Sequence, residues 1–162
     1  MKRRRNLLSL LLFAAAPAVA QPQSLGIFGT WGAFRGDGRC YAITAPYQAP
    51  AAEGWRPFTS VGYWPQRRIG GQLHVRLSRE KRPGSAVLLR IDGRSFQLSG
   101  NGRDAWAPDS RADDQILSAM RTGIEMSVET RSLRGLLVRD LYRLRGAATA
   151  IDAAAVACLR RG

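Results

Sequence analysis

The sequence contains few of the residue types that carry most enzyme and metal chemistry. Its 162 residues include one histidine, His74, and two cysteines, Cys40 and Cys158. A zinc site usually needs three or four nitrogen or sulfur ligands, so no histidine-based zinc centre is expected. The glycine-rich segment 100–104 lacks the lysine and serine of a phosphate-binding loop, and no serine has a G-x-S-x-G context. We therefore expect no catalytic residue, no cofactor and no bound metal.

Two polar features leave an enzyme of unrecognised type as an alternative. His74 lies on the polar side of an alternating segment, where we interpret it as a surface residue, because a catalytic histidine needs a positioned partner and a cleft. Asp109, Asp113 and Asp114 form a carboxylate cluster that could serve a glycosidase or bind calcium. Capping of a helix that begins near Ser110 is the favoured explanation for this cluster.

The sequence also lacks an apolar run long enough to span a bilayer. The apolar run at 7–16 follows the basic residues 2–5 and precedes the small residues 18–20, a pattern typical of a cleaved signal peptide. A twin-arginine signal at 4–8 is the alternative for this leader. We predict a signal peptide over 1–20, a single mature domain over 21–162, a periplasmic or secreted location and no transmembrane anchor.

Lysine is scarce in the predicted mature chain, where Lys81 is the only one, and arginine is abundant. Without the four basic residues of the leader, 21 basic and 12 acidic residues remain, a net charge of about +9. Because guanidinium groups bind phosphates through paired hydrogen bonds, the expected partner is an anionic envelope component or a protein. A codon bias toward arginine is the alternative explanation. Nucleic acid is not an expected partner, because the exported chain has no recognisable nucleic-acid-binding motif.

The candidate anion-binding residues lie within and on either side of the alternating segment 72–79. In this segment apolar Leu73, Val75 and Leu77 alternate with polar residues. The candidate residues are Arg67, Arg68, Arg76, Arg79, Lys81 and Arg82. A strand of eight residues spans about 26 Å, so the loop before it and the turn after it should lie at opposite ends. A solvated basic face that binds nothing is the alternative.

Cys40 and Cys158 are predicted to form a disulfide, because two cysteines of an exported chain most simply pair. The bond would close a loop of 118 residues. The loss of chain entropy in the unfolded state would then stabilise the fold by up to about 4–5 kcal/mol. Two buried free thiols are the alternative.

Short alternating segments separated by turn residues predict a mainly β fold. Expected strands cover 27–34, 40–44, 58–64, 72–79, 86–91, 94–99, 124–130 and 136–144. A short helix follows Ser110 and ends at Gly123, and an alanine-rich terminal helix covers about 148–159. This number and spacing of strands favour a β-sandwich. Its four tryptophans are expected to fill the core, with a ligand-binding aromatic cluster as the alternative.

The tripeptide Arg35-Gly36-Asp37 is known as a cell-adhesion signal when it is exposed on a loop. One copy is weak evidence in a chain so rich in arginine and glycine. Asp37 and Gly38 are also typical of a tight turn between two strands. We therefore interpret the tripeptide as a turn.

Three segments resemble the invasion-associated locus B family: LRIDGRSFQL (89–98), AWAPDSRADDQILSAMRTGIEMSVET (105–130) and YRLRGAATAIDAAAVAC (142–158). The resemblance implies an immunoglobulin-like β-sandwich with one short helix and a C-terminal helix, in a periplasmic or secreted protein. The family is named for a role in bacterial entry into host cells. Segment 45–71 does not resemble it closely. The expected function is that of a non-enzymatic envelope protein that recognises an anionic envelope or host surface; the alternatives are a host-cell adhesin and an enzyme.

Overall fold

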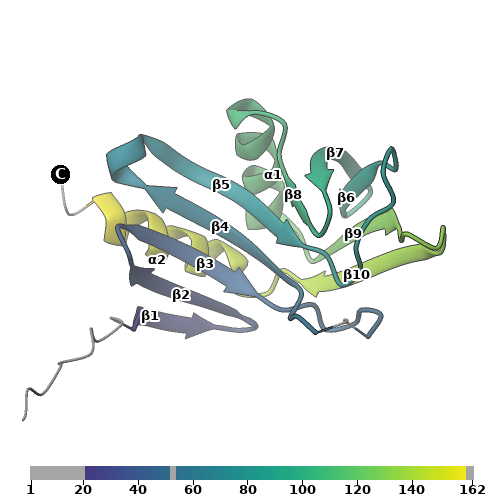
Figure 1. Ribbon diagram of the computed structural model, residues 1–162. Helices are drawn as coiled ribbons and strands as arrows, with labels where there is room; N and C mark the ends of the chain where they lie inside the picture. The colour runs from purple at the N-terminus through teal and green to yellow at the C-terminus, as the bar shows by residue number, and fades with distance from the viewer. Residues whose placement is uncertain (1–20, 52–53, 160–162) are drawn as a thin grey trace, which may run out of the picture.

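A computed structural model describes residues 21–51 and 54–159, which form a mainly β domain with two α-helices (Figure 1). The strands are β1 (Gln23–Phe28), β2 (Trp31–Gly36), β3 (Arg39–Thr44), β4 (Phe58–Trp64), β5 (Ile69–Arg76), β6 (Val87–Ile91), β7 (Arg94–Asn101), β8 (Asp104–Trp106), β9 (Glu125–Arg131) and β10 (Leu137–Arg143). The helices are α1 (Ser110–Thr122) and α2 (Ala147–Leu159), and a 3₁₀ turn, η1 (Pro65–Arg67), joins β4 to β5. The predicted signal peptide lies outside the described residues.

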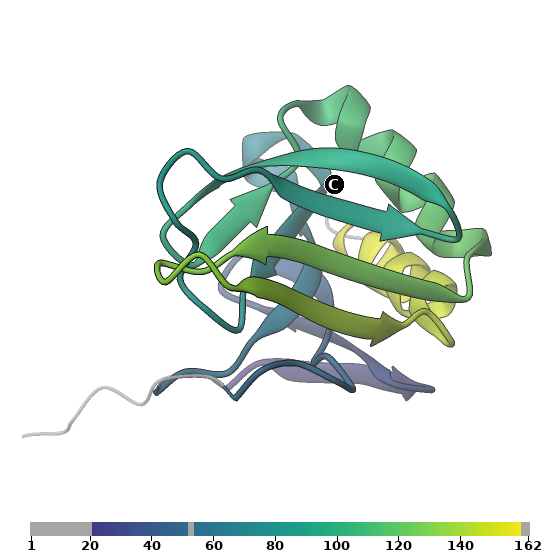
Figure 2. The ribbon, with the colours of Figure 1, turned by 90° about the vertical axis from the view of Figure 1, so that its right-hand side faces the viewer.

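The strands form one antiparallel sheet that bends into two layers. Their order is β1-β2-β3-β4-β5-β8-β7-β6-β9-β10. The first part of β7, residues 94–98, pairs with β6, whereas residues 99–101 pair with β8, so the sheet changes direction along β7. Figure 2 shows β6, β7, β9 and β10 as one layer in front of the other strands. This arrangement confirms the predicted mainly β, sandwich-like fold with one short and one C-terminal helix.

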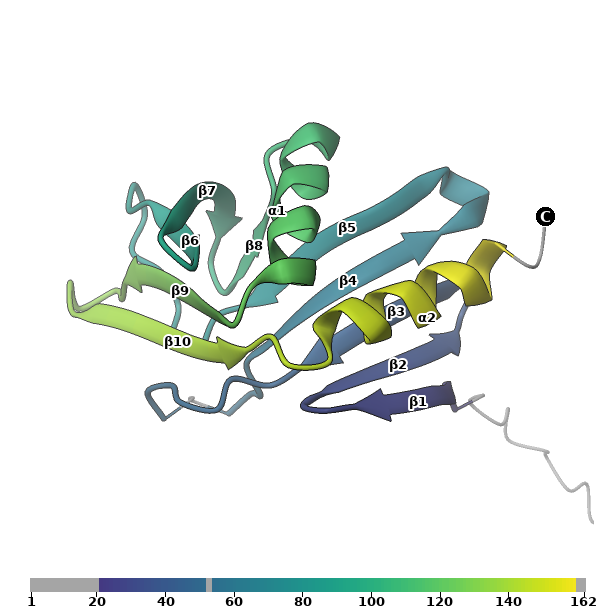
Figure 3. The same ribbon diagram turned by 180° about the vertical axis from the view of Figure 1, so that it is seen from behind.

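The two helices cover the inner face of the sheet (Figure 3). Helix α2 packs against β1–β4, and α1 packs against β5. Alanines at 147, 150 and 154 are buried, and their small side chains let α2 lie close to the strands. The largest fully buried side chains include Trp31, Leu73, Leu89, Ile116, Met126 and Tyr142. One continuous core therefore joins both layers and both helices.

The expected first strand at 27–34 is wrong, because these residues form the end of β1, a turn and the start of β2. Gly29 in this turn has a φ of +59°, and the turn packs against the junction between β10 and α2. At Gly146 in that junction a Cβ would lie 1.8 Å from the Phe28 carbonyl oxygen. The Trp31 indole Nε1 donates to the Arg143 carbonyl at 3.0 Å. The turn is thus fixed by long-range packing that local alternation does not reveal.

Two details of the alternating segment also differ from the prediction. Leu73, Val75 and Leu77 are fully buried, as expected, but Ser78 is buried as well and does not share the outer face of His74. Its backbone N–H donates to the Asp140 carboxylate at 2.9 Å, and its hydroxyl donates to the other carboxylate oxygen. Strand β5 also ends at Arg76 rather than at the predicted Arg79, and Ser78 supplies donors that the buried Asp140 carboxylate needs.

Only one of the four tryptophans lies in the core, so the expected role of the other three is wrong. Trp31 is fully buried, Trp55 and Trp64 are half-buried, and Trp106 is 37% exposed. Trp106 lies on β8, a strand that the sequence did not predict, because a three-residue strand is too short to show alternation. Aliphatic residues and methionine fill the core in place of these tryptophans.

Candidate functional site

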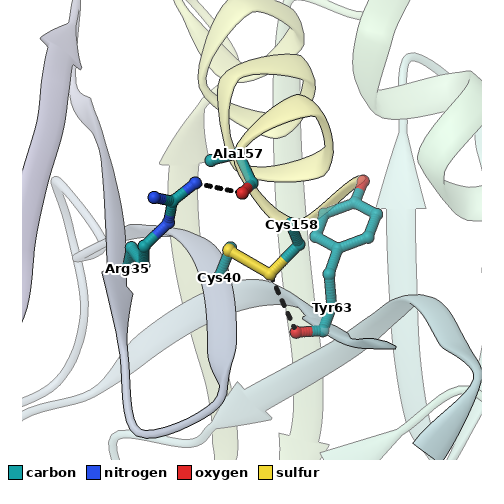
Figure 4. Close-up of a disulfide and its surroundings, with 5 residues drawn as sticks. All are labelled: Arg35, Cys40, Tyr63, Ala157 and Cys158. Atoms are coloured by element: carbon teal, nitrogen blue, oxygen red, sulfur yellow. Dashed lines mark hydrogen bonds between the residues drawn. A yellow bond between two sulfur atoms is a disulfide. The ribbon is translucent and has the colours of Figure 1, made fainter. Parts of the chain in front are cut away.

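The predicted disulfide is present and ties the C-terminal helix α2 to the β2–β3 hairpin (Figure 4). Cys40 lies on β3 and Cys158 on α2, with an S–S distance of 2.10 Å and a Cα–Cα distance of 5.8 Å. Cys40, Ala154, Ala157 and Cys158 form a small second core cluster. Both cysteines are therefore buried against apolar neighbours on one side, and on the other they line a pocket of about 530 Å³ shared with Arg35 and Asp37.

The Arg-Gly-Asp tripeptide lies beside this disulfide, where its arginine is engaged by the helix. The Arg35 guanidinium donates to the backbone carbonyl of Ala157 near the end of α2 (Figure 4). Asp37 and Gly38 have φ angles of +51° and +70° and form the turn between β2 and β3. Asp37 is exposed, but Arg35 is half-buried. This arrangement favours the interpretation of the tripeptide as a structural turn.

The six candidate anion-binding residues divide into three groups along β5. Arg67 and Arg68 are exposed at η1, before the strand begins. Arg79, Lys81 and Arg82 follow the strand and lie at its other end. Arg76 lies on β5 itself. The structure therefore does not gather all six residues at one place.

The three residues that follow β5 are not equally accessible. Lys81 is only 8% exposed, and its ammonium donates to the Arg82 carbonyl at 3.2 Å. Arg79 is half-buried, whereas Arg82 is exposed. Lys81 thus has a structural role, and Arg82 is the most accessible of these candidate anion ligands.

The turn at 79–82 lies against the hairpin that joins β9 to β10. The Arg82 N–H donates to the Arg131 carbonyl at 2.8 Å, and the Leu133 N–H donates to the Glu80 carbonyl at 3.2 Å. Lys81 and Ser132 form an isolated antiparallel bridge. This contact brings two further arginines, Arg131 and Arg134, beside the predicted group. They lie some 50 residues away in the sequence, so local spacing carried no signal for them.

Arg76 is paired with a carboxylate that also binds the single histidine. Asp104 on β8 accepts from Arg76 Nε at 3.0 Å and contacts His74 Nε2 at 2.7 Å. Partial burial raises the pKa of Asp104, but the hydrogen bonds from Arg76 and His74 outweigh it and hold the pKa below its ordinary value. Arg76 is therefore already partnered, which weakens its case as an anion ligand.

Aromatic rings complete this cluster on the outer face of the sheet. The His74 ring stacks on Trp106 with 5.1 Å between centroids and meets Phe58 edge to face. Ser60 lies opposite His74 in the β4–β5 pairing, but no hydrogen bond joins the two side chains in the described part of the chain. A serine nucleophile needs its base within hydrogen-bond reach. The cluster is thus better explained as a packed ion-pair network than as a catalytic triad.

The carboxylate cluster of the sequence has mainly structural roles. Asp109 caps α1, which begins at Ser110, and the Asp109 carboxylate accepts from the Ala112 N–H at 2.8 Å. Asp113 is buried and accepts from the Leu73 N–H at 2.8 Å, which joins α1 to β5. Burial raises the pKa of Asp113. Helix capping therefore accounts for Asp109, and a helix-to-strand contact accounts for Asp113.

These features define a class of protein: a mainly β, disulfide-closed domain with arginine-rich surface turns. None of its described helices is long and apolar enough to cross a membrane. No protein-family model matches the sequence, and a search of curated proteins finds no match.

The fold is similar to that of a solved structure. The structure of this chain is similar to the crystal structure of invasion associated protein B from Bartonella henselae, with a TM-score of 0.60. The match covers 88% of this chain and 100% of that one, at 14% sequence identity. The resemblance of three sequence segments to the invasion-associated locus B family is thus confirmed at the level of the fold.

Proposed function

We propose that the chain is an exported, non-enzymatic envelope protein of the invasion-associated locus B type, which recognises an anionic surface through its arginine-rich turns. The shared fold supports the family, and the buried disulfide supports an oxidising compartment such as the periplasm. Recognition by arginines needs no covalent step, because guanidinium groups bind phosphates or carboxylates directly.

The observation that carries this proposal is the contact between the turn 79–82 and the hairpin 131–137. We call these two segments together the basic tip. The basic tip contains five basic residues, Arg79, Lys81, Arg82, Arg131 and Arg134, and one acidic residue, Glu80. The Glu80 carboxylate oxygen Oε2 lies 3.9 Å from Arg103 Nε, and this ion pair partly neutralises the negative charge of Glu80. Neither Arg82 nor Arg134 forms an ion pair within the described residues, so both can bind an external anion.

Binding at the basic tip should depend strongly on salt, because exposed charges are screened within about 8 Å at physiological ionic strength. The test measures binding of the purified protein to lipopolysaccharide over a range of salt concentrations. The variant Arg82→Glu with Arg134→Glu should bind much more weakly. The matched control is Arg67→Glu with Arg68→Glu, which makes the same charge change at the opposite end of β5 and should bind nearly as the native protein does. Equal losses of lipopolysaccharide binding in both variants would show that binding depends on net charge alone and not on the basic tip.

Host-cell adhesion through the Arg-Gly-Asp tripeptide is the less favoured function. The hydrogen bond from Arg35 to Ala157 draws the arginine toward α2, whereas an adhesion loop would present it to a receptor. An enzyme is also less favoured, since the partners of His74 are an ion-paired aspartate and aromatic rings.

A further inference from the structure

The basic tip also exposes three leucines. Leu133, Leu136 and Leu137 are 56%, 66% and 59% exposed. They lie in the β9–β10 hairpin, which protrudes from one end of the molecule (Figures 1 and 3). Single exposed apolar residues are common, but neighbouring ones on a protruding loop form a candidate contact surface.

Leucines and arginines meet in one depression at this tip. Its volume is about 420 Å³, and its lining includes the three leucines together with Arg79, Arg134 and one acidic residue, Glu80. Arg82 and Arg131 lie on the adjoining backbone, joined by the hydrogen bond between their main chains. The apolar area therefore lies beside more basic than acidic side chains, with Arg82 and Arg134 among its exposed cations.

We infer that the hairpin 131–137 docks the protein on an anionic phospholipid bilayer. The leucines enter the boundary between headgroups and acyl chains, and the arginines bind the headgroup phosphates. Apolar side chains beside basic ones bind membrane interfaces in this way, and negative lipid attracts basic residues near its surface. The inference rests on the proposed function, since it identifies the anionic surface as a lipid bilayer.

The hairpin is held in shape before any lipid binds. The Ser132 N–H donates to the Leu136 carbonyl at 2.9 Å, and the Gly135 N–H donates to the Ser132 carbonyl at 2.8 Å. The Arg131 guanidinium donates to the Gly135 carbonyl at 3.0 Å. Because the turn is already ordered, docking costs little conformational entropy. A protein groove could also receive a leucine tip, but the excess of positive charge beside the leucines favours a surface of uniform negative charge.

The test is co-sedimentation of the periplasmically purified protein with vesicles. Vesicles of phosphatidylglycerol mixed with phosphatidylcholine are compared with vesicles of phosphatidylcholine alone. The native protein should bind the mixed vesicles much more tightly than those of phosphatidylcholine alone, and a weaker apolar part of the binding should survive high salt. The variant Leu133→Ser with Leu136→Ser should bind the mixed vesicles about tenfold more weakly and lose the salt-resistant part.

Two comparisons keep the result specific. The control Ile124→Ser removes a side chain that is 80% exposed just before β9, at the opposite end of that strand, and should bind as the native protein does. The leucine variant should keep its affinity for lipopolysaccharide at low salt, because its arginines are unchanged. The midpoint temperature of thermal unfolding should be nearly unchanged in the leucine variant and in Ile124→Ser, since the side chains removed are exposed.

The outcomes separate this inference from the proposed function. If the native protein binds lipopolysaccharide but not the mixed vesicles, or if the leucine variant binds the vesicles as well as the native protein, the docking inference is overturned and the proposed function stands. If the native protein binds neither, both fail, and the exposed leucines would then fit a protein partner. Loss of vesicle binding in the leucine variant alone supports the inference.

Discussion

The guanidinium of Arg35 donates to the carbonyl of Ala157, next to the half-cystine Cys158 (Figure 4). A positive charge at the C-terminal end of α2 also interacts favourably with the helix dipole. The disulfide and this hydrogen bond therefore hold the same end of the helix against β2 and β3. The first arginine of an apparent adhesion signal is thus part of the fold.

Replacing Arg35 should affect stability more than replacing Asp37. Arg35→Met keeps the aliphatic stem but removes the hydrogen bond, and we expect it to lower the free energy of unfolding by about 1–2 kcal/mol. Asp37→Glu keeps the charge at an exposed position and should leave attachment to host cells unchanged; its effect on unfolding should be smaller than that of Arg35→Met, because only the preference of aspartate for the φ of +51° is lost. Urea unfolding and a cell-attachment assay measure these effects. Loss of attachment in Asp37→Glu would restore the adhesin hypothesis.

The disulfide should make a large contribution to stability. It closes a loop of 118 residues, so its removal frees the unfolded chain substantially. We expect the Cys40→Ser, Cys158→Ser double variant to lose about 2–5 kcal/mol in urea unfolding. Thiol labelling of the denatured native protein should find no free cysteine, and its intact mass should show a chain that begins at Gln21. Labelling of both cysteines would contradict the predicted compartment.

Asp104 should stabilise the fold more at neutral pH than in acid. Its pKa in the folded state lies below the ordinary value of 3.8, so its contribution is present above that value and is lost as the pH falls through the folded pKa. The stability difference between the native protein and Asp104→Asn should therefore be constant above pH 3.8 and shrink below it. Urea unfolding over an acid pH series measures this difference. A difference that stays constant to the lowest pH would show that the carboxylate charge is irrelevant.

Asp140 should show the opposite dependence on pH. The residue is fully buried, and burial raises its pKa above 3.8 although Ser78 donates two hydrogen bonds to it. Its contribution is therefore complete below the unfolded pKa and is lost as the pH rises through the folded pKa. Relative to Asp140→Asn, the native protein should lose stability as the pH rises from 3.8 toward neutrality. If the stability difference between the native protein and Asp140→Asn instead grew as the pH rose, as expected for Asp104, the role assigned to burial would be contradicted.

Local sequence patterns predicted most of the strands and both helices. The alternation around Leu73 and Val75 and the Asp-Gly turn at 37–38 are both found in the structure, because side-chain direction and turn conformation are local properties. The failures are long-range features. The turn at Gly29 depends on packing against Gly146, and the strand β8 exists because β5 and β7 pair with it from either side.

The candidate site could be predicted only in part for the same reason. Arg82 was found because it lies in a charged turn, but Arg134 and the exposed leucines were not connected to it. Their proximity follows from the pairing of β6 with β9, which brings the hairpin beside the turn that precedes β6. Arg76 was selected for its charge, and only the structure shows that Asp104 partners it.

By itself the sequence determined the charge of the protein, the mainly β character of the chain, the turns at Asp-Gly pairs and the pairing of its only two cysteines, since each depends on composition or on neighbouring residues. Tertiary structure decided which charges are neutralised, which tryptophan is buried and which segments share a surface. These properties depend on contacts between residues far apart in the chain, and such contacts arise only when the strands select their partners in the folded sheet.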